Sequence, residues 1–87
     1  MAVLMIGEVP EAMYAEMVEK MVPRIRASKG FISHGAGPTP SGGWRIVEMW
    51  ETEEDGQRWF DENIKVRLPP GFTPDRNYFP LQTAITK

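Results

Sequence analysis

The order of strand-like and helix-like segments is the feature that most constrains the fold of this chain. Residues 2–6 form an apolar run closed by Gly7, which predicts a strand buried on both faces. After Pro10, apolar residues recur at spacings of three and four and predict an amphipathic helix, whose apolar side carries Tyr14, Met17, Val18, Met21 and Ile25. Pro23 is expected to kink or interrupt this helix, and Ser28-Lys29-Gly30 is expected to end it.

The middle of the chain predicts a hairpin. Residues 31–34 begin a second strand, and residues 35–43 are too rich in glycine and proline to be expected as anything but a loop. Residues 44–51 (WRIVEMWE) are rich in aromatic and β-branched side chains, which favours a third strand. The two strands joined by that loop should therefore pair.

A second helix and a last strand complete the pattern. Thr52 followed by three acidic residues is typical of a helix start, and the helix should carry Trp59, Phe60 and Ile64 on its apolar side. Residues 68–71 (LPPG) end it, and residues 78–86 predict the last strand.

The resulting order predicts one α+β domain over residues 1–87. It is that of a ferredoxin-like β-α-β-β-α-β sandwich with an antiparallel four-stranded sheet. In this topology the first and third strands are central, which agrees with their being the most apolar. Pro80 lies in the last predicted strand, and proline suits an edge because it cannot donate to a neighbouring strand.

Composition removes several classes of function. The chain has 87 residues, no cysteine, one histidine and a net charge of −2, with acids and bases interspersed. Thiol chemistry is excluded, and neither a metal site nor a nucleic-acid partner is expected. No motif for a cofactor is present, so none is expected. The apolar start lacks a basic region and is too short to cross a membrane, so we expect a cytoplasmic protein without a membrane partner.

Both faces of the predicted sheet look apolar. In the third strand, Trp44, Ile46 and Trp50 share one face, while Val47 and Met49 share the other. Two short helices can cover only one face, and an apolar face of several hundred Å² is unusual on a soluble monomer. The pattern predicts a homodimer that packs sheet against sheet. The alternative is that some of these side chains simply lie at the surface.

Three segments resemble a known superfamily. Pro10–Tyr14, Gly30–His34 and Gly43–Thr52 resemble the dimeric α/β-barrel superfamily, and within it small proteins of the antibiotic-biosynthesis monooxygenase-like type. The resemblance implies a dimeric α/β barrel with a pocket between helices and sheet. It also implies a range of activities: cofactor-independent oxygenation of polycyclic phenols, haem degradation, lactone isomerisation, or none assigned.

The family monooxygenases tend to use a tryptophan, an asparagine and a polar or basic residue. By resemblance Trp50 takes the place of the tryptophan, and His34 lies where polar pocket residues often occur. Neither Asn63 nor Asn77 lies at a matching motif. The second predicted helix offers no histidine to ligate haem.

His34 is the candidate catalytic residue. An imidazole titrates near neutral pH, so His34 can accept a phenolic or α-carbon proton. Its alternative role is an ordinary hydrogen bond at the strand end. The candidate substrate-binding residues are Trp50, Trp59, Arg45 and Tyr14.

Each of the four binding candidates also has a purely structural explanation. Trp50 and Trp59 can stack on a planar substrate or can be plain core. Arg45 can bind an anionic group or can pair with a glutamate in solvent. Tyr14 can hydrogen-bond a ligand, but its spacing with Met17 and Met21 also makes it a core residue.

The sequence thus favours a cofactor-independent monooxygenase-like enzyme that acts on an aromatic or enolisable apolar small molecule. A phenolate or enolate can reduce oxygen directly if the protein positions and desolvates it. The alternatives are a lactone isomerase-type enzyme, a dimer that binds a small molecule without catalysis, and a dimer whose pocket is filled by its own side chains.

Overall fold

The computed structural model describes residues 2–86, and its elements follow the predicted order. They are β1 (Val3–Val9), α1 (Glu11–Arg26), β2 (Phe31–Pro38), β3 (Trp44–Trp50), α2 (Glu53–Trp59) and β4 (Asp75–Pro80). The second helix continues beyond α2 as a π-helical segment, η1 (Phe60–Ile64), and a 3₁₀ turn, η2 (Lys65–Arg67).

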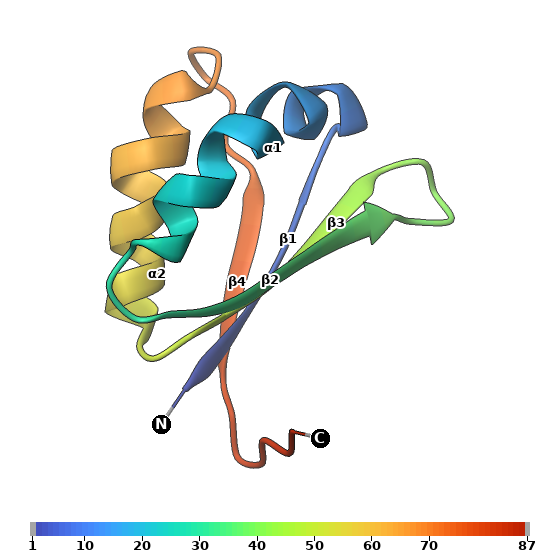
Figure 1. Ribbon diagram of the computed structural model, residues 1–87. Helices are drawn as coiled ribbons and strands as arrows, with labels where there is room; N and C mark the ends of the chain where they lie inside the picture. Colours follow the sequence, from blue (N-terminus) through green and yellow to red (C-terminus); the bar gives the residue numbers. More distant parts are fainter. Residues whose placement is uncertain (1, 87) are drawn as a thin grey trace.

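The four strands form one antiparallel sheet in the order β2-β3-β1-β4. β1 and β3 are central, and the strand that contains Pro80 is an edge, both as predicted. The two helices lie on one side of the sheet (Figure 1). The chain therefore has the α+β, ferredoxin-like architecture that the sequence predicts.

The predicted interruption at Pro23 is wrong. α1 runs through Pro23 and ends at Arg26. Proline removes one backbone hydrogen bond from a helix, but the turn beyond it carries Ile25, which is buried in the core. Packing of that side chain holds the last turn in place.

Three strands have bounds that differ from those expected. The first strand was expected to close at Gly7, but β1 runs on to Val9. β2 continues through residues 35–38, which were expected to be loop, and the loop is confined to residues 39–43. As an edge strand, β2 needs a partner on one side only, and β3 supplies it over the whole length, so glycines and a terminal proline are tolerated. β4 begins at Asp75 and ends at Pro80, so residues 81–86 lie outside the strand.

The core lies between the sheet and the helices. Its buried members are Met5, Met21, Ile25, Trp50 and Trp59. The helix α2 approaches the sheet closely because it carries Gly56: a Cβ there would lie 2.9 Å from the Tyr78 ring and 3.0 Å from the Trp50 indole. Thr52 caps α2 as predicted, since its hydroxyl accepts a hydrogen bond of 3.1 Å from the Asp55 amide.

The other face of the sheet is open, and we call it the outer face. Strand register places five apolar side chains on it: Leu4, Ile6, Val47, Met49 and Phe79. Val47 is 39% exposed and Phe79 is 48% exposed. Neither helix covers this face (Figure 1). Over residues 2–86, no helix is both long and apolar enough to cross a membrane.

Candidate functional site

A pocket lies between the two helices and the inner face of the sheet. Its walls are mainly apolar, and its aliphatic lining includes Met5, Met17, Met21, Val18 and Ile64. The whole hollow, including its open mouth, measures about 690 Å³. Only about 80 Å³ of it is open to the centres of water-sized molecules. This accessible space is smaller than a cavity of roughly 150 Å³ that binds benzene. A ring must therefore occupy part of the mouth or displace the methionines.

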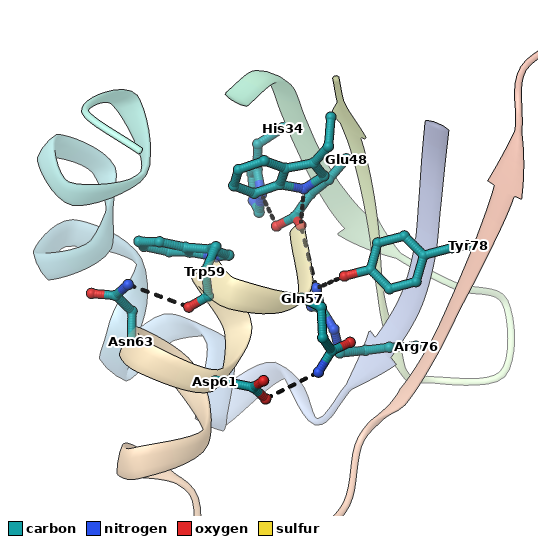
Figure 2. A network of polar contacts seen from close by, with 9 residues as sticks. His34, Glu48, Gln57, Trp59, Asp61, Asn63, Arg76 and Tyr78 are labelled. Atoms are coloured by element: carbon teal, nitrogen blue, oxygen red, sulfur yellow. Dashed lines mark hydrogen bonds and ion pairs between the residues drawn. The ribbon is translucent and has the colours of Figure 1, made fainter. Parts of the chain in front are cut away.

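Six polar residues line this pocket: Glu8, Asp75 and a connected group of four, namely Tyr14, His34, Glu48 and Arg76. The Tyr14 hydroxyl lies 2.9 Å from His34 Nε2, and His34 Nδ1 lies 2.9 Å from Glu48 Oε2. The second carboxylate oxygen of Glu48 accepts a hydrogen bond of 3.0 Å from the Trp50 indole. Figure 2 shows the Glu48 carboxylate between His34 and Arg76. We call Tyr14, His34 and Glu48 the relay.

The hydrogen bonds of the relay assign its protons. A carboxylate only accepts, so Glu48 requires a proton on His34 Nδ1. In the neutral imidazole, His34 Nε2 is then the acceptor, and the Tyr14 hydroxyl donates to it. A base whose second nitrogen is oriented by a buried carboxylate is the arrangement found in catalytic triads. His34 is thereby held with its basic nitrogen toward Tyr14.

Arg76 balances the charge of the buried carboxylate. The side chain of Glu48 is 3% exposed and that of Arg76 is 12% exposed, and the two groups approach to 3.8 Å. Arg76 also donates a hydrogen bond of 2.8 Å to the Tyr78 hydroxyl, and its guanidinium lies 4.4 Å from the centre of the Phe60 ring. Its Nε is buried and has no hydrogen-bond partner. Arg76 therefore keeps one donor unused at the pocket.

Burial, and secondarily the negative charge of Glu48, raises the pKa of the Tyr14 phenol. The Tyr14 and His34 rings are stacked, with centroids 6.0 Å apart and planes 10° apart. Trp44 lies on the other side of Tyr14, with ring centroids 5.9 Å apart. Tyr14 is therefore a protonated hydrogen-bond donor at neutral pH.

The structure brings together three of the five candidate residues. His34, Tyr14 and Trp59 line the pocket. Trp50 does not line it: the indole is fully buried beneath the site and supports Glu48. Arg45 is farther away, because strand alternation turns it to the outer face, where it pairs with Glu8 at 3.1 Å and is 50% exposed. A role for Arg45 in this pocket would need a rearrangement of that strand.

Two polar residues of the site, Glu48 and Arg76, were not among the predicted site residues. A signal for Glu48 was present, since alternation in the third strand puts it on the same face as Ile46 and Trp50. A carboxylate at an inward position needs a partner. Arg76 lay outside the predicted last strand, so its inward direction had no sequence signal. The asparagines Asn63 and Asn77 do not line the pocket; the Asn63 amide donates to the Trp59 carbonyl oxygen.

Sequence comparison gives no match, whereas comparison of structures does. No family model matches the chain, and no curated protein matches it in sequence. The structure of Rv0793 from Mycobacterium tuberculosis matches with a TM-score of 0.73 and 13% identity, over 98% of this chain and 100% of that one. SnoaB, a cofactor-independent oxygenase from Streptomyces nogalater, matches with a TM-score of 0.63 and 12% identity, over 99% and 98%.

A third similar structure is that of a protein with a different activity. MhuD, a haem degrader from Mycobacterium tuberculosis with two haems bound in its active site, matches with a TM-score of 0.62 and 17% identity, over 99% of this chain and 100% of that one. Identities this low bear on the fold alone, and these proteins differ in what they do. The chain therefore has the ferredoxin-like fold of these structures, as its resemblance to antibiotic-biosynthesis monooxygenase-like proteins predicted.

Proposed function

We propose that this protein is a cofactor-independent monooxygenase-like enzyme for an aromatic or enolisable apolar small molecule, with His34 as its general base. The observation that carries the proposal is the relay at the wall of an apolar pocket. His34 Nδ1 is fixed by Glu48, so Nε2 is the nitrogen that accepts a proton. The imidazolium that results is stabilised by the Glu48 carboxylate.

The pocket lining fits the proposed substrate class. Apolar side chains surround a small group of polar ones, which is the usual composition of a small-molecule site. Trp59 presents an aromatic wall, and the flexible methionines can adapt to a ring. A phenolate or carbanion formed between these apolar walls can react with dioxygen, because the walls keep competing proton donors away from it.

We also propose that the protein acts as a homodimer through the outer face of its sheet. Leu4, Ile6, Val47, Met49 and Phe79 form an apolar surface that neither helix covers. A second copy packed on this face by two-fold symmetry would remove it from water. The fold supports this assembly, because the resemblance noted above is to dimeric barrels. The lack of cysteine in the sequence fits the cytoplasm as its compartment.

Anthrone oxygenation tests the enzyme proposal. One anthrone and one dioxygen give one anthraquinone and one water, so product formation and oxygen uptake must agree. We expect the purified protein to accelerate this reaction and His34→Ala to lower the rate about 10²–10⁴-fold. Equal rates for the two proteins would remove His34 from the mechanism. An enolisable lactone tested in parallel distinguishes oxygenation from isomerisation, since isomerisation consumes no oxygen.

A non-catalytic binding protein is the second candidate. It is favoured by one observation: Nε2 of His34 is already occupied by the Tyr14 hydroxyl, as in a site that holds a ligand rather than converts it. That role predicts thermal stabilisation by the ligand with no product. Haem degradation fits less well, because the single histidine has both ring nitrogens hydrogen-bonded within the protein.

A further inference from the structure

The free state of the site already contains a phenol bound to the proposed base. Tyr14 donates to His34 Nε2 at 2.9 Å, with the two rings nearly parallel. A neutral imidazole has one acceptor nitrogen with one lone pair. A ligand hydroxyl can therefore reach His34 Nε2 only if the Tyr14 hydroxyl turns to another acceptor.

We propose that the ligand is a phenol or enol that the pocket binds as an oxyanion, held jointly by His34 and Tyr14, and that Tyr14 switches its hydrogen bond from His34 to the ligand oxygen. This inference rests on the proposed role of His34 as base. It adds the ionisation state of the ligand and a catalytic role for Tyr14.

The proton that leaves the ligand in this step stays within the site. The ligand O–H bond breaks, its proton forms the N–H bond at His34 Nε2, and Tyr14 keeps its own proton. Before the transfer, Glu48 and Arg76 cancel and His34 is neutral; afterwards the imidazolium and the oxyanion cancel as well. The net charge of the pocket is unchanged. Binding of an already ionised ligand to neutral His34 would instead add one net negative charge to an apolar cavity.

The surroundings of Tyr14 suit a donor rather than a second base. Burial and the charge of Glu48 raise the pKa of this phenol, which keeps the hydroxyl proton in place. A hydrogen bond to an anionic oxygen is about twice as strong as one between neutral groups. Tyr14 therefore gains by exchanging the neutral imidazole for the oxyanion, and this gain favours ionisation of the ligand.

A chromophoric phenol measures this ionisation directly. The probe is 4-nitrophenol, whose phenolate is yellow, at a pH about one unit below the pKa of the free dye, where most of it is the colourless phenol. We expect the wild-type protein to bind the dye as phenolate. In Tyr14→Phe the ring remains and only the hydroxyl is lost, so we expect the pKa of the bound dye to rise by about one unit and its affinity to fall about tenfold. In His34→Gln, we expect any bound dye to stay colourless.

Tyr78→Phe is the matched control. It removes the other tyrosine hydroxyl of the chain, which contacts Arg76 and is not part of the pocket lining. We expect the colour of the bound dye to be unchanged in this variant. Equal effects of the two tyrosine variants would contradict a specific role for Tyr14.

Three results would overturn the inference. The first two are a wild type that binds the dye only as the phenol, and a wild type that fails to bind it at about millimolar concentration. The third is a Tyr14→Phe variant that binds the phenolate as tightly as the wild type or more tightly. In that case the Tyr14 hydroxyl would block His34 rather than donate a hydrogen bond to the ligand. The test needs no turnover. Dye ionisation without anthrone oxidation would sink the enzyme proposal alone, and oxidation without dye ionisation would sink this inference alone.

Discussion

The two faces of β3 reverse the usual rule of burial. On the inner face Glu48 is buried at 3% exposure, while on the outer face Val47, an apolar residue, is 39% exposed. Folding alone would favour the opposite arrangement, since a buried charge costs free energy and a buried valine gains it. The proposals above account for both reversals: the inner face would serve the ligand site, and the outer face would serve association with a second copy.

The two reversals differ in how the molecule compensates for them. Glu48 is compensated within the chain, by His34, Trp50 and Arg76. Val47 and its neighbours are not compensated within one chain. The charge on the inner face is therefore compensated within one chain, whereas a second copy would cover the outer face in the proposed dimer. Changes to the two faces should have separable effects, on chemistry in one case and on assembly in the other.

The largest effect should come from Glu48→Gln. This change removes the acceptor that orients His34 and leaves the Arg76 charge unpaired, so we expect anthrone turnover to fall about 10³-fold or more. Unfolding in urea should show a loss of about 3 kcal/mol of stability. Glu51→Gln is the control, because Glu51 is exposed and should cost nothing measurable. If the Glu48 variant were as stable as the wild type, the buried charge on the inner face would not need its compensation by His34, Trp50 and Arg76.

Val47→Glu tests the outer side. The change places a charge in the centre of the outer face, so we expect dimer dissociation to become at least about 100-fold easier, since an unpaired buried charge costs several kcal/mol. Sedimentation at micromolar concentration measures it. The control is Val66→Glu: Val66 is 69% exposed and lies in η2, away from the sheet. A wild-type protein that sediments as a 9.9 kDa monomer would refute the dimer outright.

Two glycines, one just before β2 and one near its end, differ in how closely they are packed. Gly30 has φ of 81°, and a Cβ there would collide with the Asp55 carboxylate at the start of α2. We therefore expect Gly30→Ala to cost about 2 kcal/mol of unfolding free energy, from backbone strain and displaced packing. Gly37 in the exposed half of β2 has no atom within 4 Å of a Cβ, so Gly37→Ala should change stability by less than about 1 kcal/mol. Equal costs would show that the two ends of β2 are packed alike.

The same contrast explains what the sequence could predict. The helix α2, its Thr52 cap and the central strands carry local signals, namely a capping side chain and apolar periodicity. All three occur as predicted, although β1 runs past Gly7 to Val9. The extent of β2 is set by pairing with β3 rather than by its own glycines, so the expected loop at residues 35–38 was wrong. Tertiary pairing overrode the local turn signal.

The candidate site shows the same limit. The sequence pointed to His34 and Tyr14 singly, but their contact joins residues 20 positions apart, and such contacts depend on how α1 crosses the sheet. Arg45 and Glu48 lie in one strand and both are charged. Side chains alternate between the two faces along the strand, and this alternation alone decides that Glu48 enters the pocket and Arg45 faces away.

The smallest expected effect is an alkaline titration of the two tyrosines, both of which lie on the inner side of the sheet, Tyr14 on α1 and Tyr78 on β4. Burial is the main cause that raises the pKa of each phenol; the charge of Glu48 adds to it at Tyr14, whereas Arg76 opposes it at Tyr78. An unfolded tyrosine ionises near about pH 10, so above that pH the folded chain holds more protons than the unfolded one. The stability that the neutral phenols contribute is therefore fully present below about pH 10. It is lost as the pH rises through the pKa values of the folded protein.

Tyrosinate absorbance against pH, together with urea unfolding at each pH, checks this prediction. In Tyr14→Phe we expect one of the two tyrosine ionisations at raised pH to vanish. The loss of stability at alkaline pH should become smaller. In Glu48→Gln, the Tyr14 transition should move to lower pH, because one of its two causes is removed. A Tyr14 phenol that ionises at or below the pH of a free tyrosine would mean that the inner face is wet, and the contrast between the two faces of β3 would then rest on the outer face alone.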